Sequence, residues 1–355
     1  MKRNILFALS ISLVGCVAIN ENTQEENNSS EIKNTDNKIE NSKNIEMTGY
    51  SVGFYNVENL FDTKDDPNTS DDWFTPEGEA QWDQTRYLKK LKDLSKVISS
   101  LNENGPSLLG LCEVENKEVV NDLIKEPLLM NTNYKIVHYD SPDTRGIDVA
   151  AIYDSELFDL ISSESIEVEM PEDPAIKTRD ILYCQLQSKL NNEVLHFYVN
   201  HWSSRRKGEQ ETFFKRKNCV TTLVNHMKEM QLDLENDNIV IVGDMNDYPD
   251  DKSIYEILEA KEANAGTSLV NIQYDNHSEG KGTYNHQGDW GVLDNIIVSR
   301  VVYNNLKEKD ADIFDEDWVM YFNKNGDAMP NKTYGGPKYY GGYSDHLAVC
   351  FTLMM

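Results

Sequence analysis

Strand-like patterns are the most frequent feature of the hydrophobic sequence. The stretch YSVGFYNV at 50–57 alternates with a two-residue period, which places Val52, Phe54 and Asn56 on one side of a strand. The run from Ile239 to Val242 contains no polar residue and predicts a strand that is buried on both faces. Further strands are predicted at 107–115, 134–140, 148–154, 180–190, 193–202, 291–299 and 346–353.

Helical spacing is less common along the chain. The pattern predicts short helices at 116–125 and near 252–260 and a long helix within 209–232. It also predicts an amphipathic helix over 84–101. The apolar face of the last is formed by Leu88, Leu91, Leu94, Ile98 and Leu101. Strands outnumber helices, and many neighbouring strands lack a helix long enough for a parallel crossover. The pattern therefore favours an α/β (α+β) fold with two mixed, mostly antiparallel β-sheets and helices outside them.

The N-terminal segment has the features of an export signal. Lys2 and Arg3 precede an apolar run that is too short to span a bilayer comfortably. The sequence LVGC that ends at Cys16 resembles a bacterial lipobox, which implies a lipoprotein signal peptide over 1–15, lipid attachment at Cys16 and a place in the bacterial cell envelope, at the outer membrane or cell surface. The alternative is an ordinary cleaved signal with a chance cysteine.

Composition changes sharply after the signal. The residues from 17 to 48 contain no aromatic residue and no proline, so we predict that 16–48 is a flexible polar tether and that one domain covers 49–355. The later cysteines include no close pair, and we expect neither a disulfide nor a zinc-thiolate site, although an exported chain could form one bridge. These cysteines are Cys112, Cys184, Cys219 and Cys350.

The formal net charge of the 355-residue chain is −27. This charge repels polyanions at long range and argues against a nucleic-acid binder that is held by charge alone. It leaves open an enzyme in which a metal ion and local arginines bind the substrate.

Polar residues recur at the ends of the predicted strands. If these ends converge, carboxylate and amide oxygens suit Mg²⁺ or Mn²⁺, with Ca²⁺ as a further possibility, and the imidazoles can transfer protons or bind phosphate near neutral pH. The residues are Asn56, Glu113, Asn200, His201, Asp244, Asn246, Asp294, Asp345 and His346.

Several of these residues lie in motifs that resemble the endonuclease/exonuclease/phosphatase superfamily, which has the deoxyribonuclease I-like fold. The motifs cover nearly all of 49–355 in the order seen in that superfamily. They are FYNVENLFD, GLCEVEN, RGIDVAAIYD, VNHWSSR, GDMND, LDNIIVS and SDHLAVCF. The resemblance implies a four-layer sandwich, with the two sheets packed face to face, and a metal-dependent phosphodiester hydrolase.

The resemblance also implies a role for each matching residue. Asn56, Glu113 and Asp345 are expected at the metal. His346 is expected to contact the phosphate and Asp294 to orient it. Asp244 and Asn246 are expected to position or deprotonate the attacking water, and His201 resembles a second catalytic histidine.

Other residues are candidates for substrate contact. Arg145 and Asp148 lie in the RGIDVA stretch, and Asn200 precedes His201. Arg205 and Arg206 begin a basic run that continues to Lys217, where guanidinium groups suit phosphate, although such runs are usually solvated. Trp290 flanks the substrate or is a packed loop aromatic.

Each catalytic candidate also has a structural interpretation. Glu113 could cap the helix that begins at 116, Asn56 could be a turn residue, and His201 could be a hydrogen-bonded core histidine. We assign the remaining histidines a structural role: His138, His196, His226, His277 and His286.

The leading hypothesis from the sequence is an envelope or extracellular endonuclease that cuts DNA or RNA and acts as a monomer. The alternative is a phosphatase or a phospholipid phosphodiesterase, similar to a sphingomyelinase, which fits the charge and the predicted anchor. A third hypothesis is a surface binding protein without catalysis.

Overall fold

The computed structural model describes residues 49–103 and 105–354, which form one compact unit. The predicted signal peptide, the lipid-modified cysteine and the tether therefore lie outside the described residues. No helix in the described ranges is both long and apolar enough to cross a bilayer.

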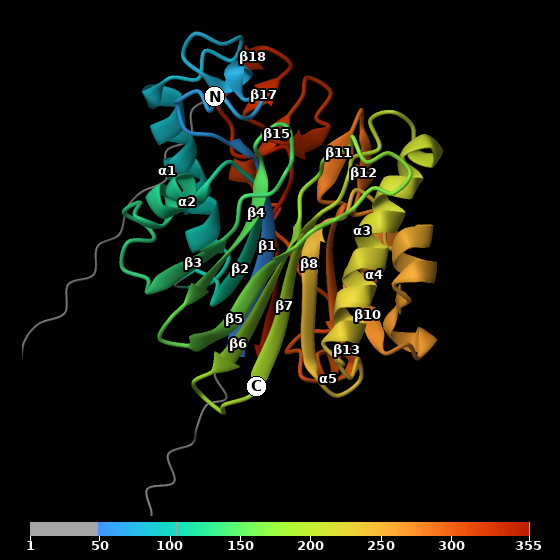
Figure 1. Cartoon of the computed structure of the whole chain (residues 1–355). Helices are drawn as coiled ribbons and strands as arrows, with labels where there is room; N and C mark the ends of the chain where they lie inside the picture. The colour runs from blue at the N-terminus through green and yellow to red at the C-terminus, as the bar shows by residue number, and fades with distance from the viewer. Residues whose placement is uncertain (1–48, 104, 355) are drawn as a thin grey trace, which may run out of the picture. The chain divides into compact units, whose positions relative to one another are not determined.

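Two β-sheets make up the centre of the unit (Figure 1). The first sheet contains, in order, β14 (Asp312–Ile313), β19 (Val349–Met354), β1 (Gly49–Leu60), β2 (Leu108–Val114), β4 (Asp148–Asp154) and β3 (Tyr134–His138). The second contains, in order, β5 (Phe158–Ile166), β6 (Ile181–Ser188), β7 (Val194–His201), β8 (Asn238–Asp244), β13 (Asp294–Ser299), β10 (Leu269–Asn271) and β9 (Ala260–Lys261).

Both sheets are mixed and mostly antiparallel, as the pattern predicted. The parallel pairs are β1 with β2, β7 with β8, and β9 with β10. Alternation along β1 divides its side chains between two cores: Val52 and Phe54 lie between the sheets, whereas Tyr55 and Val57 face the helices. Burial on both faces explains the apolar strand sequences.

Helices cover the outer face of each sheet (Figure 1). α1 (Gln84–Ser100) and α2 (Lys117–Ile124) cover the first sheet, and α3 (Glu209–Glu229) covers the second. The order helix, sheet, sheet, helix is the expected four-layer sandwich. Short helical elements are η1 (Asp72–Phe74), η2 (Ser253–Ile257), η3 (Ala263–Ala265), α4 (Tyr274–Ser278), α5 (Arg300–Asn304) and η4 (Asp317–Val319).

Three small hairpins lie at one end of the sheets (Figure 1). They are β11 (Tyr284–His286) with β12 (Asp289–Gly291), β15 (Met320–Phe322) with β16 (Ala328–Pro330), and β17 (Tyr334–Gly335) with β18 (Lys338–Tyr339). The sequence pattern did not predict these strands, nor β5, β9, β10 and β14.

Some predicted elements differ from the structure. Leu88 is 51% exposed, so the expected apolar face of α1 was wrong at this position, and the neighbouring Tyr87 is buried instead. The helix predicted near 252–260 is only the π-helical turn η2, because Glu259 takes a positive φ of 57° and Ala260 pairs with β10. The last strand begins at Val349 rather than at His346.

The cysteines of the domain are all free and buried. Burial raises the pKa of Cys184 to about 12 and that of Cys219 to about 11. These thiols act as small apolar side chains of the core.

Candidate active site

Three neighbouring strands of the second sheet bring acidic and imidazole side chains to one end. In the parallel pair β7 and β8, His201 lies opposite Asp244. In the antiparallel pair β8 and β13, Asp244 lies opposite Asp294. The strand register alone therefore aligns these three residues across the sheet.

The first sheet contributes Asn56 and Glu113 at interruptions of its ladder. The pairing of β1 with β2 shifts register between Asn56 and Leu60, and the pairing of β2 with β4 shifts between Cys112 and Val114. Glu113 has a φ of 61°. Such bulges redirect a side chain from the regular alternation. Asn56 therefore does not end its strand, as the sequence suggested, but lies at an irregularity within β1.

A hydrogen bond joins the two sheets at this point. The side-chain amide of Asn56 donates to Asp244 Oδ2 at 3.1 Å. Glu113 Oε2 accepts from the backbone N–H of Asn59 at 3.0 Å, which holds the carboxylate beside β1. The candidate site thus spans the junction of the two sheets.

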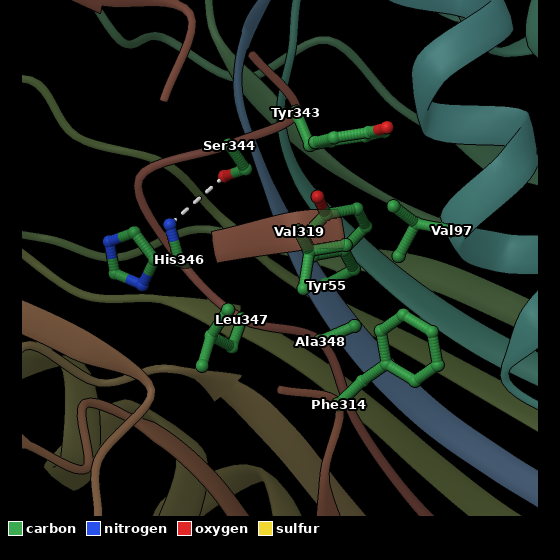
Figure 2. Close-up of a pocket in the computed structure, with 9 residues that line it drawn as sticks. All are labelled: Tyr55, Val97, Phe314, Val319, Tyr343, Ser344, His346, Leu347 and Ala348. Atoms are coloured by element: carbon green, nitrogen blue, oxygen red, sulfur yellow. Dashed lines mark hydrogen bonds between the residues drawn. The ribbon is translucent and has the colours of Figure 1, made fainter. Parts of the chain in front are cut away.

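His346 stands between two carboxylates. Its Nδ1 lies 2.7 Å from Asp294 Oδ2, and its Nε2 lies 3.8 Å from Asp244 Oδ2. The ring of Tyr284 packs on the imidazole with a centroid distance of 4.8 Å. In Figure 2 the imidazole points away from the apolar side chains of Tyr55 and Phe314.

These contacts decide the protonation states. Burial opposes a charge on His346, but Asp294 and Asp244 outweigh burial and hold the pKa of His346 well above its usual value. Burial raises the pKa of Asp244 to about 7, against the effect of the His346 cation. At neutral pH His346 is charged, and Asp244 is close to its midpoint of titration.

His201 has the opposite electrostatic environment. Burial, together with the cations Arg179 and Arg145, lowers the pKa of His201 well below its usual value. Its Nε2 lies 3.8 Å from Glu113 and 3.7 Å from Asp244, beyond hydrogen-bond distance. His201 is therefore a neutral imidazole at physiological pH and not a proton donor comparable with His346.

Asn246 follows β8 in a left-handed conformation with a φ of 49°. Its backbone N–H donates to Asp244 Oδ1 at 3.0 Å, and its side-chain amide donates to the carbonyl of Trp202 at 3.0 Å. These bonds fix Asn246 directly beside Asp244.

Two of the predicted substrate contacts have structural partners instead. Asn200 is fully buried, donates to the Val242 carbonyl at 3.2 Å and accepts from the Trp202 indole at 3.1 Å. The guanidinium of Arg205 binds the carbonyl of Asn246 and forms ion pairs with Glu209, Asp247 and Asp251. Both residues are satisfied within the protein and position the ends of β7 and β8.

The other predicted substrate residues are placed differently. Arg145 is exposed, and its charge acts on His201. Arg206 is also exposed. Trp290 is half-buried on β12 and packs against the core beneath the first sheet. Asp148 is buried at the start of β4, where Oδ1 accepts from the backbone N–H of Ser141 at 2.9 Å.

Sequence reasoning missed four residues that support the site. Tyr284 packs on His346, and Arg179 donates to the carbonyls of His201 and Trp202. Glu58 and Lys90 are buried behind the first sheet. The position of Lys90 on the apolar face of α1, between Tyr87 and Leu94, is a sequence signal that could have identified it.

A profile of the Endonuclease/Exonuclease/phosphatase family matches residues 51–355. The chain belongs to this family. Members of the family are phosphoester hydrolases, and the junction of the two sheets is the candidate active site.

Several solved structures have the same fold as this chain. One is an endonuclease/exonuclease/phosphatase family protein from Bacteroides thetaiotaomicron, 16% identical, with 86% of this chain and 98% of that chain covered at a TM-score of 0.54. A mannosyl-6-phosphatase from the same organism is 17% identical, with 86% and 100% covered at 0.54. The human Nocturnin catalytic domain is 15% identical, with 86% and 92% covered at 0.50. These likenesses show the fold alone, and a search of curated protein sequences found no match.

Divalent metal ions are general in this family, and the active site has groups that could hold one. Asp244, Asp294 and His346 offer ligand atoms within 4.8 Å of one another. Since Asp294 and His346 already bind each other, the carboxylates of Glu113 and Asp345 are the freer oxygen donors. Burial, opposed by His346 and reinforced by Glu113, raises the pKa of Asp345.

A second group that could hold a cation lies at the ends of β3 and β4. It consists of His138, Asp140 and Asp148, with His138 Nε2 3.3 Å from Asp148 Oδ2. His138 was expected to be structural and Asp148 to face the substrate, whereas the structure pairs them with each other.

Proposed function

We propose that this protein is a divalent-metal-dependent phosphodiester hydrolase, and that its substrate is DNA or RNA. The observation that carries the proposal is the charged imidazole of His346, which has the carboxylate of Asp294 on one side and that of Asp244 on the other. Asn56 and Glu113 lie next to this array. Phosphodiester cleavage needs a proton acceptor for water and positive charge at the phosphoryl oxygens, and this array offers both.

Each residue has a task that follows from its contacts. Asp244, with a pKa of about 7, accepts a proton from the attacking water, and Asn246 holds the loop beside it. His346 keeps its proton through Asp294 and presents Nε2–H to a phosphoryl oxygen. His201, being neutral, contributes a hydrogen bond rather than a charge.

The metal ion would be held by Glu113 and Asp345, with Asn56 beside them. When bound, Mg²⁺ or Mn²⁺ supplies Lewis-acid stabilisation of the phosphoryl oxygens, and Ca²⁺ remains a candidate for the same oxygen ligands. Carboxylate and amide oxygens are the ligands that these ions prefer, which supports the assignment.

The test is hydrolysis of plasmid DNA, RNA, bis(4-nitrophenyl) phosphate and sphingomyelin, with each metal ion and with chelator. Glu113→Gln should abolish metal-dependent turnover, because it removes a charged ligand. Glu118→Gln is the matched control, since Glu118 is an exposed residue on α2. Plasmid nicking that is lost in Glu113→Gln and retained in Glu118→Gln would support the nuclease.

The second candidate is a phosphatase or a phospholipid phosphodiesterase. The net charge of −27, which repels polyanions, and the predicted lipid anchor favour it, and one protein of the same fold is a mannosyl-6-phosphatase. Cleavage of only the small or lipid esters would select this candidate. No turnover of any ester would leave a surface binding protein.

We also propose that the protein is a monomer anchored to the bacterial envelope through Cys16. Labelling of cells with radioactive palmitate should mark the wild type and not Cys16→Ser, and light scattering should give the mass of one chain. Release of both proteins into the medium would contradict the anchor.

A further inference from the structure

A cavity of about 480 Å³ lies among the small hairpins at the end of the sheets. It opens between β15, β16 and β18, and its volume is within the range of small-ligand sites. Side chains of Tyr321, Met329, Asn331, Lys332, Lys338 and Tyr340 line it. None of these residues is part of the catalytic array.

Backbone hydrogen bonds join the cavity wall to the catalytic segment. The carbonyl of Asn331 accepts from the N–H of Tyr343 at 2.6 Å, two residues before Asp345. The carboxylate of Glu58, two residues after Asn56, accepts from the N–H groups of Thr333 and Tyr334 at 2.6 and 3.0 Å. One wall of the cavity is thus fixed to the strand that carries Asn56.

The other wall contacts the hairpin that carries Tyr284, a neighbour of His346. β16, which contributes Met329, packs against β11. β11 carries Tyr284, whose ring packs at a tilt against the imidazole of His346. The hairpin that lines this side of the cavity therefore contacts the hairpin whose Tyr284 lies beside His346.

The cavity is a local concentration of positive charge in an acidic protein. The chain has 61 acidic against 34 basic residues, yet neither Lys332 nor Lys338 has a carboxylate within 4.0 Å among the residues that the structure describes. These ammonium groups are available to an anion.

Aromatic faces accompany the two lysines. Tyr321 and Tyr340 are each 52% exposed, which is high for side chains of this size. The ammonium of Lys338 lies 4.7 Å from the centroid of the Tyr340 ring. Proteins that bind single-stranded nucleic acids have exposed aromatic rings beside cations: the bases stack on the rings, and the phosphates contact the cations.

We propose that this cavity is a subsite for one nucleotide next to the scissile phosphate, with its phosphate at Lys332 and Lys338 and its base against Tyr340 or Tyr321. The inference rests on the proposed hydrolase function and specifies its substrate as a single-stranded polynucleotide. A net-negative protein would then bind a polyanion through a few local cations instead of a basic surface.

The experiment measures binding of a fluorescein-labelled oligothymidylate to the full chain in the presence of chelator, which prevents cleavage. Lys332→Ala with Lys338→Ala, and separately Tyr340→Ala, should each weaken binding by about 10-fold. An oligonucleotide with abasic sites should bind the wild type and Tyr340→Ala equally. Lys324→Ala is the control, because Lys324 is exposed in the β15–β16 turn and does not line the cavity.

Turnover of bis(4-nitrophenyl) phosphate separates this inference from the hydrolase proposal. Variants that bind the oligonucleotide as the wild type does, while the ester is still cleaved, would overturn the subsite and leave the hydrolase. Weaker binding by the cavity variants, when the wild type cleaves neither plasmid DNA, RNA nor the nitrophenyl ester, would overturn the hydrolase and with it the subsite beside a scissile phosphate, and would leave a nucleotide-binding cavity. Equal loss with the abasic oligonucleotide would overturn the role of the ring.

Discussion

Four of the nine described non-glycine residues with a positive φ lie at or next to the candidate active site. Glu58, Asn59, Glu113 and Asn246 all have φ between 49° and 61°, a region that costs most side chains about 1–3 kcal/mol. Each is held by a hydrogen bond that compensates, such as that from the N–H of Asn59 to Glu113. The positive φ of Glu113 directs its carboxylate toward the junction of the sheets.

Sequence reasoning could identify many of the active-site residues but not their supports. Asp244 and Asp294 follow from strand register, because an acid at the end of an apolar strand stays next to its neighbour in the sheet. Glu58 and Arg179 acquire their roles only through contacts with residues distant in sequence. Arg205 shows the converse, since its basic run predicted a phosphate contact while three acids already occupy it.

Removal of the charged imidazole or of the proton acceptor should abolish most activity. We expect His346→Ala and Asp244→Ala each to lower kcat by at least ~100-fold, the scale for a lost proton-transfer or transition-state contact. Steady-state kinetics on bis(4-nitrophenyl) phosphate measure this. The matched control is His286→Ala, because His286 is exposed on β11. A near-wild-type rate for either variant would remove that residue from the mechanism.

The protonation states also predict a bell-shaped pH profile. Asp244 must lose its proton to act as a base, so kcat/KM should rise with pH up to about 7, or to a lower pH where a bound cation favours the carboxylate. His346 must keep its proton, so activity should fall only at alkaline pH, because the pKa of His346 is raised. Asp244→Asn should lose the acid limb. An unchanged acid limb in its residual activity would assign that limb to another group.

At the scale of elements, the hairpins are held to the sandwich by a small buried polar network. Glu58 on β1 accepts from two backbone N–H groups near β17, and Lys90 on α1 donates to Thr333 Oγ1 and to the carbonyl of Tyr343, both at 2.6 Å. Burial and Asp345 raise the pKa of Glu58 to about 7, opposed by Lys90. Short strands of two or three residues have no sequence period, which is why the pattern did not predict them.

Loss of this network should loosen the hairpins. Glu58→Ala leaves two buried N–H groups without an acceptor, and we expect it to lower the free energy of unfolding by about 2–5 kcal/mol. Glu58→Gln keeps one acceptor and should cost less. Urea denaturation of both variants measures the difference. If Glu58→Ala were as stable as the wild type, the hairpins would be held by their own packing.

At the scale of the whole molecule, the sandwich explains how two sheets build one site. Apolar side chains from β1, β2, β7 and β8 fill the space between the sheets, and the polar residues begin where these strands end or bulge. The hydrophobic pattern predicted two mixed sheets with helices outside, because the strands and long helices have clear periods, whereas the four-layer sandwich was implied by the family resemblance. The sequence did not predict which loops would fold over the site, since those loops depend on buried contacts such as that of Lys90.

Because the net charge is −27, we expect kcat/KM on a polynucleotide to depend on salt in the opposite way from that of a basic nuclease. At about 10 mM salt the Debye length is roughly 30 Å, so the whole negative protein repels a polyanion; at about 100 mM it is roughly 10 Å, and only nearby charges act. Lys332 and Lys338 line the cavity, so they would still attract a polynucleotide bound there at the shorter Debye length. If the substrate is a polynucleotide, kcat/KM should therefore increase between these salt concentrations before it falls at higher salt, whereas cleavage of the small nitrophenyl ester should change much less. A monotonic fall from the lowest salt would mean that local cations govern approach at every distance, and that the net charge of the molecule is not felt by its substrate.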